Sequence, residues 1–241
     1  MTSNELRDYL TPRTHSFGLP LLVTVITVAW EVAAPNDAWS RIVMILLFSA
    51  ALGLTLHAAE TVTRRRRIGA LVIFVAVILM TYGNSVGNGN TWRGIGELLI
   101  ALPVLTAAFK VIQWIGRQPV INGQSVLGGV LVYMLAGLMF AQLYGAITDL
   151  TPTQDFFCNL KDSEVSQSDR VYFSFTTITT TGFGDFVSCL RLGHALSMSE
   201  AIFGQVYLVT IIALLVGNMG RRRNVGRDSD EDEPAGEPKP S

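Results

Sequence analysis

Long apolar stretches, separated by short clusters of charge, constrain this chain more than any other feature of its sequence. Only 15% of its 241 residues are charged, whereas a soluble domain carries about 25% charged residues and covers its surface with them. Much of this charge is concentrated at residues 64–67, 221–223 and 228–233. The pattern excludes a soluble enzyme and a disordered chain, and it predicts an all-α membrane protein.

Six apolar segments are candidates for transmembrane helices, which need roughly 20 residues to cross about 30 Å of hydrocarbon. They cover residues 17–34, 38–59, 68–82, 92–115, 125–147 and 195–219. The runs are solid rather than alternating, and this excludes a closed β-barrel. The polar start of the chain is unlike a cleavable signal peptide, so the first segment is expected to remain as a span.

Lysine and arginine residues predict the orientation, because they concentrate in cytoplasmic loops. Arg64–Arg67 follow the second span, Lys110 and Arg117 flank the turn after the fourth, and Arg221–Arg223 follow the sixth. Six spans with both termini in the cytoplasm place all of these groups on the inside.

The connection between the fifth and sixth spans is different in kind. Its middle, residues 171–186, is apolar and rich in threonine but too short to cross a bilayer as a helix. Non-helical backbone at membrane depth is tolerated only where it is buried in protein or lines water. We therefore expect a re-entrant segment, with a short helix over residues 169–179 whose negative C-terminal end favours a cation.

Residues 180–185, the filter segment, read Thr-Thr-Gly-Phe-Gly-Asp. A dehydrated monovalent cation needs a cage of oxygens, and rows of backbone carbonyls from four chains can supply one. Gly182 and Gly184 suit this role because glycine adopts the backbone angles that point successive carbonyls the same way. The alternative is a turn that joins two helices for packing reasons alone.

The filter segment resembles the potassium-channel signature Thr-Val-Gly-Tyr-Gly-Asp. With the Tyr172-Phe173 pair, the Thr179-Thr180 pair and the apolar span that follows, residues 125–220 resemble the pore domain of tetrameric potassium channels. The resemblance implies a homotetramer that binds potassium ions at Thr180, Thr181, Gly182, Phe183 and Gly184. It also implies that the filter is supported by Asp185, Tyr172, Phe173, Thr176 and Glu200.

Two residues depart from the signature, since Thr181 replaces valine and Phe183 replaces tyrosine. Both changes leave the backbone carbonyls in place, so potassium selectivity is expected to survive. In the family, a hydrogen-bonded cuff joins the filter tyrosine to aromatic residues of the pore helix. Phe183 lacks the hydroxyl and Phe173 lacks the indole donor of many members. We therefore hypothesise a loosely held filter, with a weakly selective monovalent cation channel as the alternative function.

The last span offers candidates for gating and for the cavity. Gly204 lies where the family often has a hinge glycine, although glycine also lets membrane helices pack closely. Leu208, Ile212 and Val216 continue down the same helical face and are candidates for lining the cavity. Glu200 either braces the filter from behind or is a solvated residue at the start of the helix.

Two cysteines, Cys158 and Cys189, flank the pore segment on the side predicted to be extracellular. An oxidising compartment permits a disulfide between them, while the reduced pair is the alternative.

The first four spans, residues 17–117, resemble a voltage-sensor domain in number and orientation only. A sensor requires several gating charges in its fourth span, where this chain has only Arg93, Glu97 and Lys110. We therefore expect no strong voltage sensing from this N-terminal domain.

The sequence thus predicts a six-span potassium channel with a re-entrant pore helix and selectivity filter between helices five and six. Its parts are a cytoplasmic N-terminus (1–16), the N-terminal domain (17–117), a pore domain (125–220) and a disordered cytoplasmic tail (221–241). We expect no enzymatic activity, no cofactor besides bound potassium, contacts with membrane lipid, no nucleic acid, and a bacterial plasma membrane location. A carrier, which would need paired broken helices, and a structural scaffold are weaker alternatives.

Overall fold

The computed structural model describes residues 16–33, 38–59, 89–118, 121–151, 156–158 and 165–231, with side chains in the last helix described only as far as Leu214. These ranges form the helices α2 (Gly18–Ala33), α3 (Ala38–Ala58), α5 (Gly89–Gly116), α6 (Gly123–Leu150), α7 (Gln167–Ile178) and α8 (Arg191–Glu231). Within the same ranges, an isolated antiparallel bridge joins Phe157 and Ser188. The described chain is therefore helical, as its apolar runs predict.

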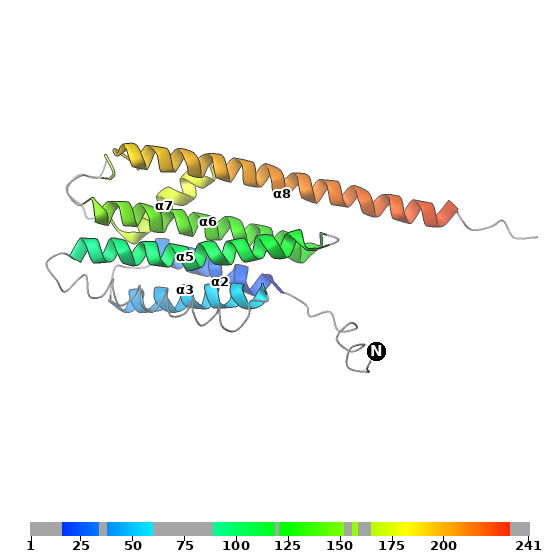
Figure 1. Cartoon of the computed structure of the whole chain (residues 1–241), viewed down its shortest axis with the longest axis horizontal. Coiled ribbons are helices and arrows are strands. Elements are labelled where there is room, and N and C mark those ends of the chain that lie inside the picture. Colours follow the sequence, from blue (N-terminus) through cyan, green and yellow to red (C-terminus); the bar gives the residue numbers. More distant parts are fainter. Residues whose placement is uncertain are drawn as a thin grey trace, which may run out of the picture.

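The long helices lie side by side, and the short helix α7 lies between α6 and α8 (Figure 1). The first residues of α5 and α8 and the last residues of α6 are at the same end of the bundle (Figure 1). This up-and-down arrangement is the one that successive crossings of a membrane require.

Five of the predicted spans coincide with helices, and the third, residues 68–82, lies outside the described residues. Two described stretches, Thr91–Gly116 and Gly123–Leu150, are long and apolar enough to cross a membrane. Gly18–Ala33 and Val43–Ala58 are apolar but shorter. The length and apolar composition of these helices support the prediction of a membrane protein.

Helices α5 and α6 are joined by a short connection, and they pack against each other. Asn122 ends this connection and caps α6, since its side chain accepts a hydrogen bond from the backbone N–H of Ser125 at 3.0 Å. Val111 of α5 and Leu131 of α6 are fully buried in the core between the helices. Helices α5 and α6 thus share one core within the chain.

Helix α8 continues to Glu231, whereas a disordered tail was predicted from residue 221. The physical reason is continuity, because the sequence offers no proline before Pro234 to interrupt the helix begun at Arg191. Residues 232–241, the remainder of that predicted tail, lie outside the described residues.

Candidate ion-conduction site

Helix α7 occupies the place predicted for the pore helix, beginning two positions earlier than expected, at Gln167. Its start is fixed by a capping box, in which Ser166 accepts from the backbone N–H of Asp169 and the Asp169 carboxylate accepts from the backbone N–H of Ser166. Since Ile178 is its last residue, the filter segment begins almost directly after the negative end of the helix.

Along the filter segment, the backbone angle φ alternates between positive and negative values. The angle φ is 55° at Thr180, 50° at Gly182 and 78° at Gly184, while Thr181 and Phe183 are not among the residues with positive φ. Among the described residues, Thr180 is the one non-glycine residue with positive φ, an outlier for a β-branched side chain. Strained backbone of this kind is concentrated at functional sites, and alternation is what a row of same-facing carbonyls requires.

Hydrogen bonds hold the inner part of this segment against the end of α7. The carbonyl oxygen of Thr176 accepts from the backbone N–H groups of Thr181 at 2.9 Å and Gly182 at 3.1 Å. The predicted supporting residue Thr176 therefore contacts the filter segment through its backbone, while its hydroxyl donates to the carbonyl of Phe173 at 3.0 Å.

Gln205 of α8 is a contact of the filter that the sequence analysis missed. Its amide donates to the hydroxyl of Thr180 at 2.7 Å, and that hydroxyl donates to the carbonyl of Thr179 at 2.7 Å. A polar residue on the inner helix one position after Gly204 was the available signal.

The end of the segment is held by a side-chain bond between two of the predicted supporting residues. The hydroxyl of Tyr172 donates to the carboxylate of Asp185 at 2.8 Å. The ring of Phe183 stacks on that of Tyr172, with 6.3 Å between ring centroids. Phe173 instead points into a separate buried aromatic cluster with Tyr144 and Phe157.

Glu200 lies behind the pore helix and is completely buried. Tyr144 of α6 donates to one of its carboxylate oxygens at 2.5 Å, and the hydroxyl of Ser174 on α7 lies 2.5 Å from the other. The alternative that Glu200 is a solvated residue at the start of the helix is therefore wrong. Its carboxylate thus links α8 to α6 and to the middle of α7.

Gly204 packs against the end of α7, where a β-carbon in its place would overlap the carbonyl oxygen of Ile178. The same carbonyl accepts a hydrogen bond from Tyr133 of α6 at 2.8 Å. Of the two readings of Gly204, this geometry supports close packing. Leu208 is partly exposed further along α8, whereas the side chains of Ile212 and Val216 lie outside the described residues.

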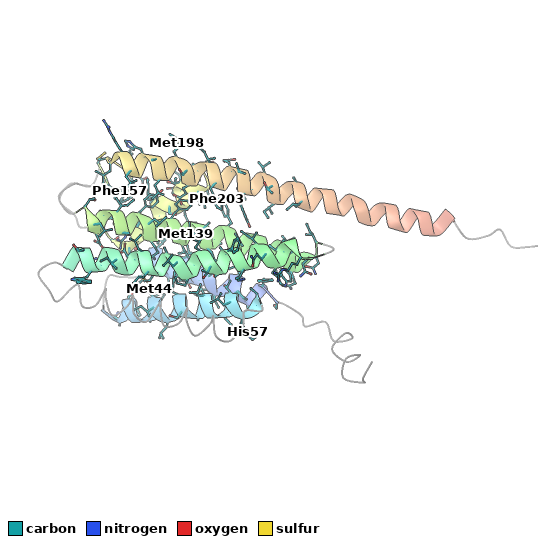
Figure 2. The ribbon with its side chains drawn as sticks, viewed as in Figure 1. Met44, His57, Met139, Phe157, Met198 and Phe203 are labelled. Atoms are coloured by element: carbon teal, nitrogen blue, oxygen red, sulfur yellow. A yellow bond between two sulfur atoms is a disulfide. The ribbon has the colours of Figure 1, made fainter. Side chains whose placement is uncertain are left out.

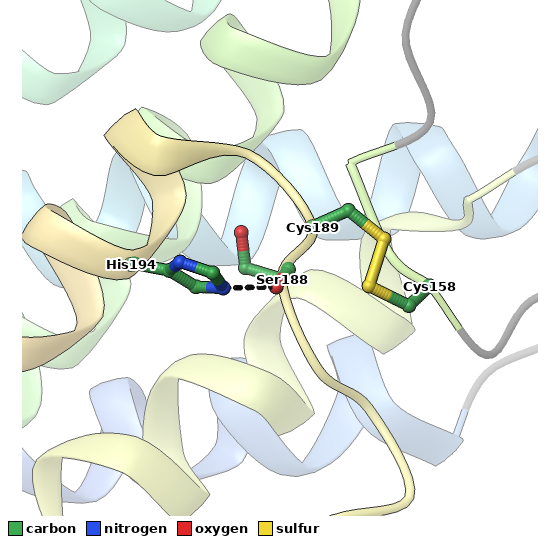
Figure 3. Close-up of a disulfide and its surroundings, with 4 residues drawn as sticks. All are labelled: Cys158, Ser188, Cys189 and His194. Atoms are coloured by element: carbon green, nitrogen blue, oxygen red, sulfur yellow. Dashed lines mark hydrogen bonds between the residues drawn. A yellow bond between two sulfur atoms is a disulfide. The ribbon is translucent and has the colours of Figure 1, made fainter.

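The two cysteines form a disulfide, with 5.2 Å between their Cα atoms (Figure 3). Backbone hydrogen bonds from Cys158 to Val187 at 2.9 Å and from Cys189 to Phe156 at 2.8 Å accompany it. A ring nitrogen of His194 lies 2.6 Å from the carbonyl oxygen of Ser188 (Figure 3). These bonds fasten the chain between the filter segment and α8 to the segment that follows α6.

Comparison with known proteins finds a match over the part of the chain that contains this site. Residues 130–220, which include α7, the filter segment and most of α6, match a protein-family model described as an ion channel. No curated protein and no solved structure matches the chain. This part of the chain is thus similar to an ion-channel domain, which indicates passive ion transport rather than catalysis.

Proposed function

We propose that this chain is the subunit of a homotetrameric, potassium-selective channel that conducts passively across a membrane. The observation that carries the proposal is the alternating hand of the backbone at Thr180, Gly182 and Gly184, directly after the end of α7. Potassium filters use rows of backbone carbonyls in place of the hydration shell of the ion. The ions would bind along Thr180, Thr181, Gly182, Phe183 and Gly184.

Four copies of the chain are proposed because one chain alone cannot surround an ion. A single chain supplies one row of carbonyls, whereas a cage around an ion needs several. The filter segment is exposed in the isolated chain, and the side chain of Phe183 is 69% exposed.

One face of α8 is also apolar and uncovered. Met198, Ile202, Val206 and Val209 are each more than half exposed, at a spacing that places them on one face of the helix. Phe203 lies on the side of α8 that faces α6, where its ring contacts that of Phe140, and Met198 lies on the other side (Figure 2). Neighbouring subunits and lipid would cover the exposed face.

Six spans with both termini in the cytoplasm would complete the proposed topology in a bacterial plasma membrane. Lys110 lies near the end of α5 and Arg117 directly follows it, at the end of the bundle opposite the first residues of α8, which the disulfide at Cys189 precedes. This separation is consistent with a basic cytoplasmic side and an oxidising outer side.

A weakly selective monovalent cation channel is the second candidate. It is favoured by Phe183, which has no hydroxyl with which to join a cuff. The bond between Tyr172 and Asp185 is an argument for the selective channel, because it restrains the outer end of the filter by another route.

Potassium flux into liposomes that contain the purified protein tests the proposal when Gly182→Ala is compared with Gly53→Ala. An alanine at Gly182 would have to adopt a φ of 50°, a left-handed conformation that costs an L-residue about 1–2 kcal/mol. A methyl group added at Gly53 in α3 meets no atom of the described chain. We expect Gly182→Ala to abolish flux and Gly53→Ala to retain it, and equal flux in both would contradict the proposal.

A further inference from the structure

A buried cluster of charge joins the N-terminal domain to the pore helix at the end of α7 opposite the filter. Arg170 lies in the first turn of α7, and its guanidinium forms an ion pair with Glu97 of α5 at 2.8 Å. The exposed fractions of these two residues are 4% and 1%. Burial of this degree is rare for charged side chains and requires pairing.

Helix α2 contributes a second acidic residue to the same place. Glu31 is 5% exposed, and its carboxylate interacts electrostatically with Arg170. Its backbone carbonyl accepts a hydrogen bond from the hydroxyl of Ser168, in the first turn of α7, at 2.7 Å. Gln167 accepts a further bond from the guanidinium at 2.6 Å. Arg170 therefore pairs with Glu97 of α5 and also interacts electrostatically with Glu31 of α2.

Gly145 of α6 provides the space through which Glu97 reaches the pore helix. A β-carbon at Gly145 would overlap both the Glu97 carboxylate and the Arg170 guanidinium. The absence of a side chain at this one position lets an acidic residue of α5 pair with a basic residue of α7 across α6. An alanine here would push the pair apart without removing either charge.

The position of the cluster links it mechanically to the filter. The other end of α7 is held by the bond from Tyr133 to Ile178 and leads directly into the filter segment. A helix of twelve residues held at both ends transmits a displacement of one end to the other.

The arrangement points to a role for Arg170 that goes beyond the function proposed above. We propose that Arg170, held by Glu97 and Glu31, is a positioning residue through which the N-terminal domain sets the placement of the pore helix and so the sodium rejection of the filter. The selectivity part of this proposal rests on the proposed function. The N-terminal domain is then a part of the permeation machinery rather than a scaffold around it.

The test compares Gly145→Ala, Arg170→Gln, Glu97→Gln and the double variant Glu97→Gln/Arg170→Gln with wild type. Gly53→Ala is the matched control for the glycine variant. Hydrogen exchange of the backbone amides of residues 167–182, followed by mass spectrometry on the full-length protein, reports the placement of α7 without reference to conduction. The permeability ratio of potassium to sodium, taken from reversal potentials in bilayers, reports the filter.

We expect Gly145→Ala and Arg170→Gln to speed exchange across residues 167–182 and to lower the permeability ratio about tenfold, with non-additive effects of the two charge deletions. Gly53→Ala should match wild type in both measurements. If Arg170→Gln does not assemble, Gly145→Ala decides the outcome, since it keeps both charges.

Wild-type exchange in Gly145→Ala would overturn the proposal. So would faster exchange together with an unchanged permeability ratio, because the cluster would then serve stability alone. If wild type conducts but does not reject sodium, the selective channel proposed above fails, whereas the exchange measurement still decides whether the cluster positions α7.

Discussion

Substitutions of Glu200 test how much its hydrogen bonds to α6 and α7 contribute to stability, apart from the packing of α8. In Glu200→Ala, the buried hydroxyl of Tyr144 loses its acceptor, while Ser174 keeps the carbonyl of Gly137 as a partner at 2.7 Å. One buried unsatisfied hydroxyl costs about 1–3 kcal/mol, and the space left by a fully buried side chain adds to this cost. We expect about 2–4 kcal/mol of destabilisation in each subunit.

The variant Glu200→Gln keeps the size of the side chain and an oxygen that can accept from Tyr144. It should therefore lose only about 0.5–1.5 kcal/mol, the net contribution of one hydrogen bond. Ser199→Ala is the neighbouring control, because Ser199 is exposed and its hydroxyl bonds only to its own helix at 2.7 Å.

Thermal dissociation of the assembled protein in detergent and the permeability ratio in bilayers measure these effects. The expected order of stability is Ser199→Ala, then Glu200→Gln, then Glu200→Ala, with sodium permeability rising in the same order. The reasoning is refuted if Glu200→Ala matches Ser199→Ala in both assays.

Three further changes probe other contacts of the filter. Gly204→Ala should displace the end of α7, because its methyl group overlaps the carbonyl oxygen of Ile178. We expect a lower single-channel conductance. Altered opening at an unchanged conductance would instead favour a hinge at Gly204. Tyr172→Phe removes a bond to a carboxylate and should speed inactivation several-fold in recordings during sustained opening, whereas an unchanged time course would show that the bond does not restrain the filter. Reduction of the bond between Cys158 and Cys189 should lower the midpoint of thermal unfolding by several degrees, and a Cys158→Ser variant should match the reduced protein; equal midpoints in the oxidised and reduced forms would contradict this.

Local sequence was sufficient to predict the short helix α7 and the backbone at the two glycines that follow it, because the physics there is local. The short helix was expected at residues 169–179 and is found at Gln167–Ile178. The left-handed angles at Gly182 and Gly184 follow from what glycine alone adopts readily. Apolar run length likewise predicted the long helices.

The contacts behind the filter could not be predicted in this way, because they join residues far apart in the chain. In the sequence, Glu97 was only one of three charged residues in the predicted fourth span. That span has too few positive charges for a voltage sensor, and nothing in the sequence indicated a partner for Glu97. Its pairing with Arg170 depends on the space at Gly145 in a third helix. Glu200 was ambiguous for the same reason, since its burial is decided by helices that pack around it.

The charged end of α8 also differs from the prediction. Composition alone predicted disorder from residue 221, because the segment has no apolar face. The helix nevertheless continues to Glu231, as an extension of the stable helix before it. Continuation of an existing helix avoids the cost of nucleation, which a composition rule does not consider.

The most direct test of the central claim is the reversal potential of currents through the purified protein in a planar bilayer, with potassium on one side and sodium on the other. A filter built on the alternating backbone of Thr180, Gly182 and Gly184 predicts a reversal potential close to the potassium equilibrium value. Currents that reverse near zero would contradict potassium selectivity and leave a weakly selective cation channel.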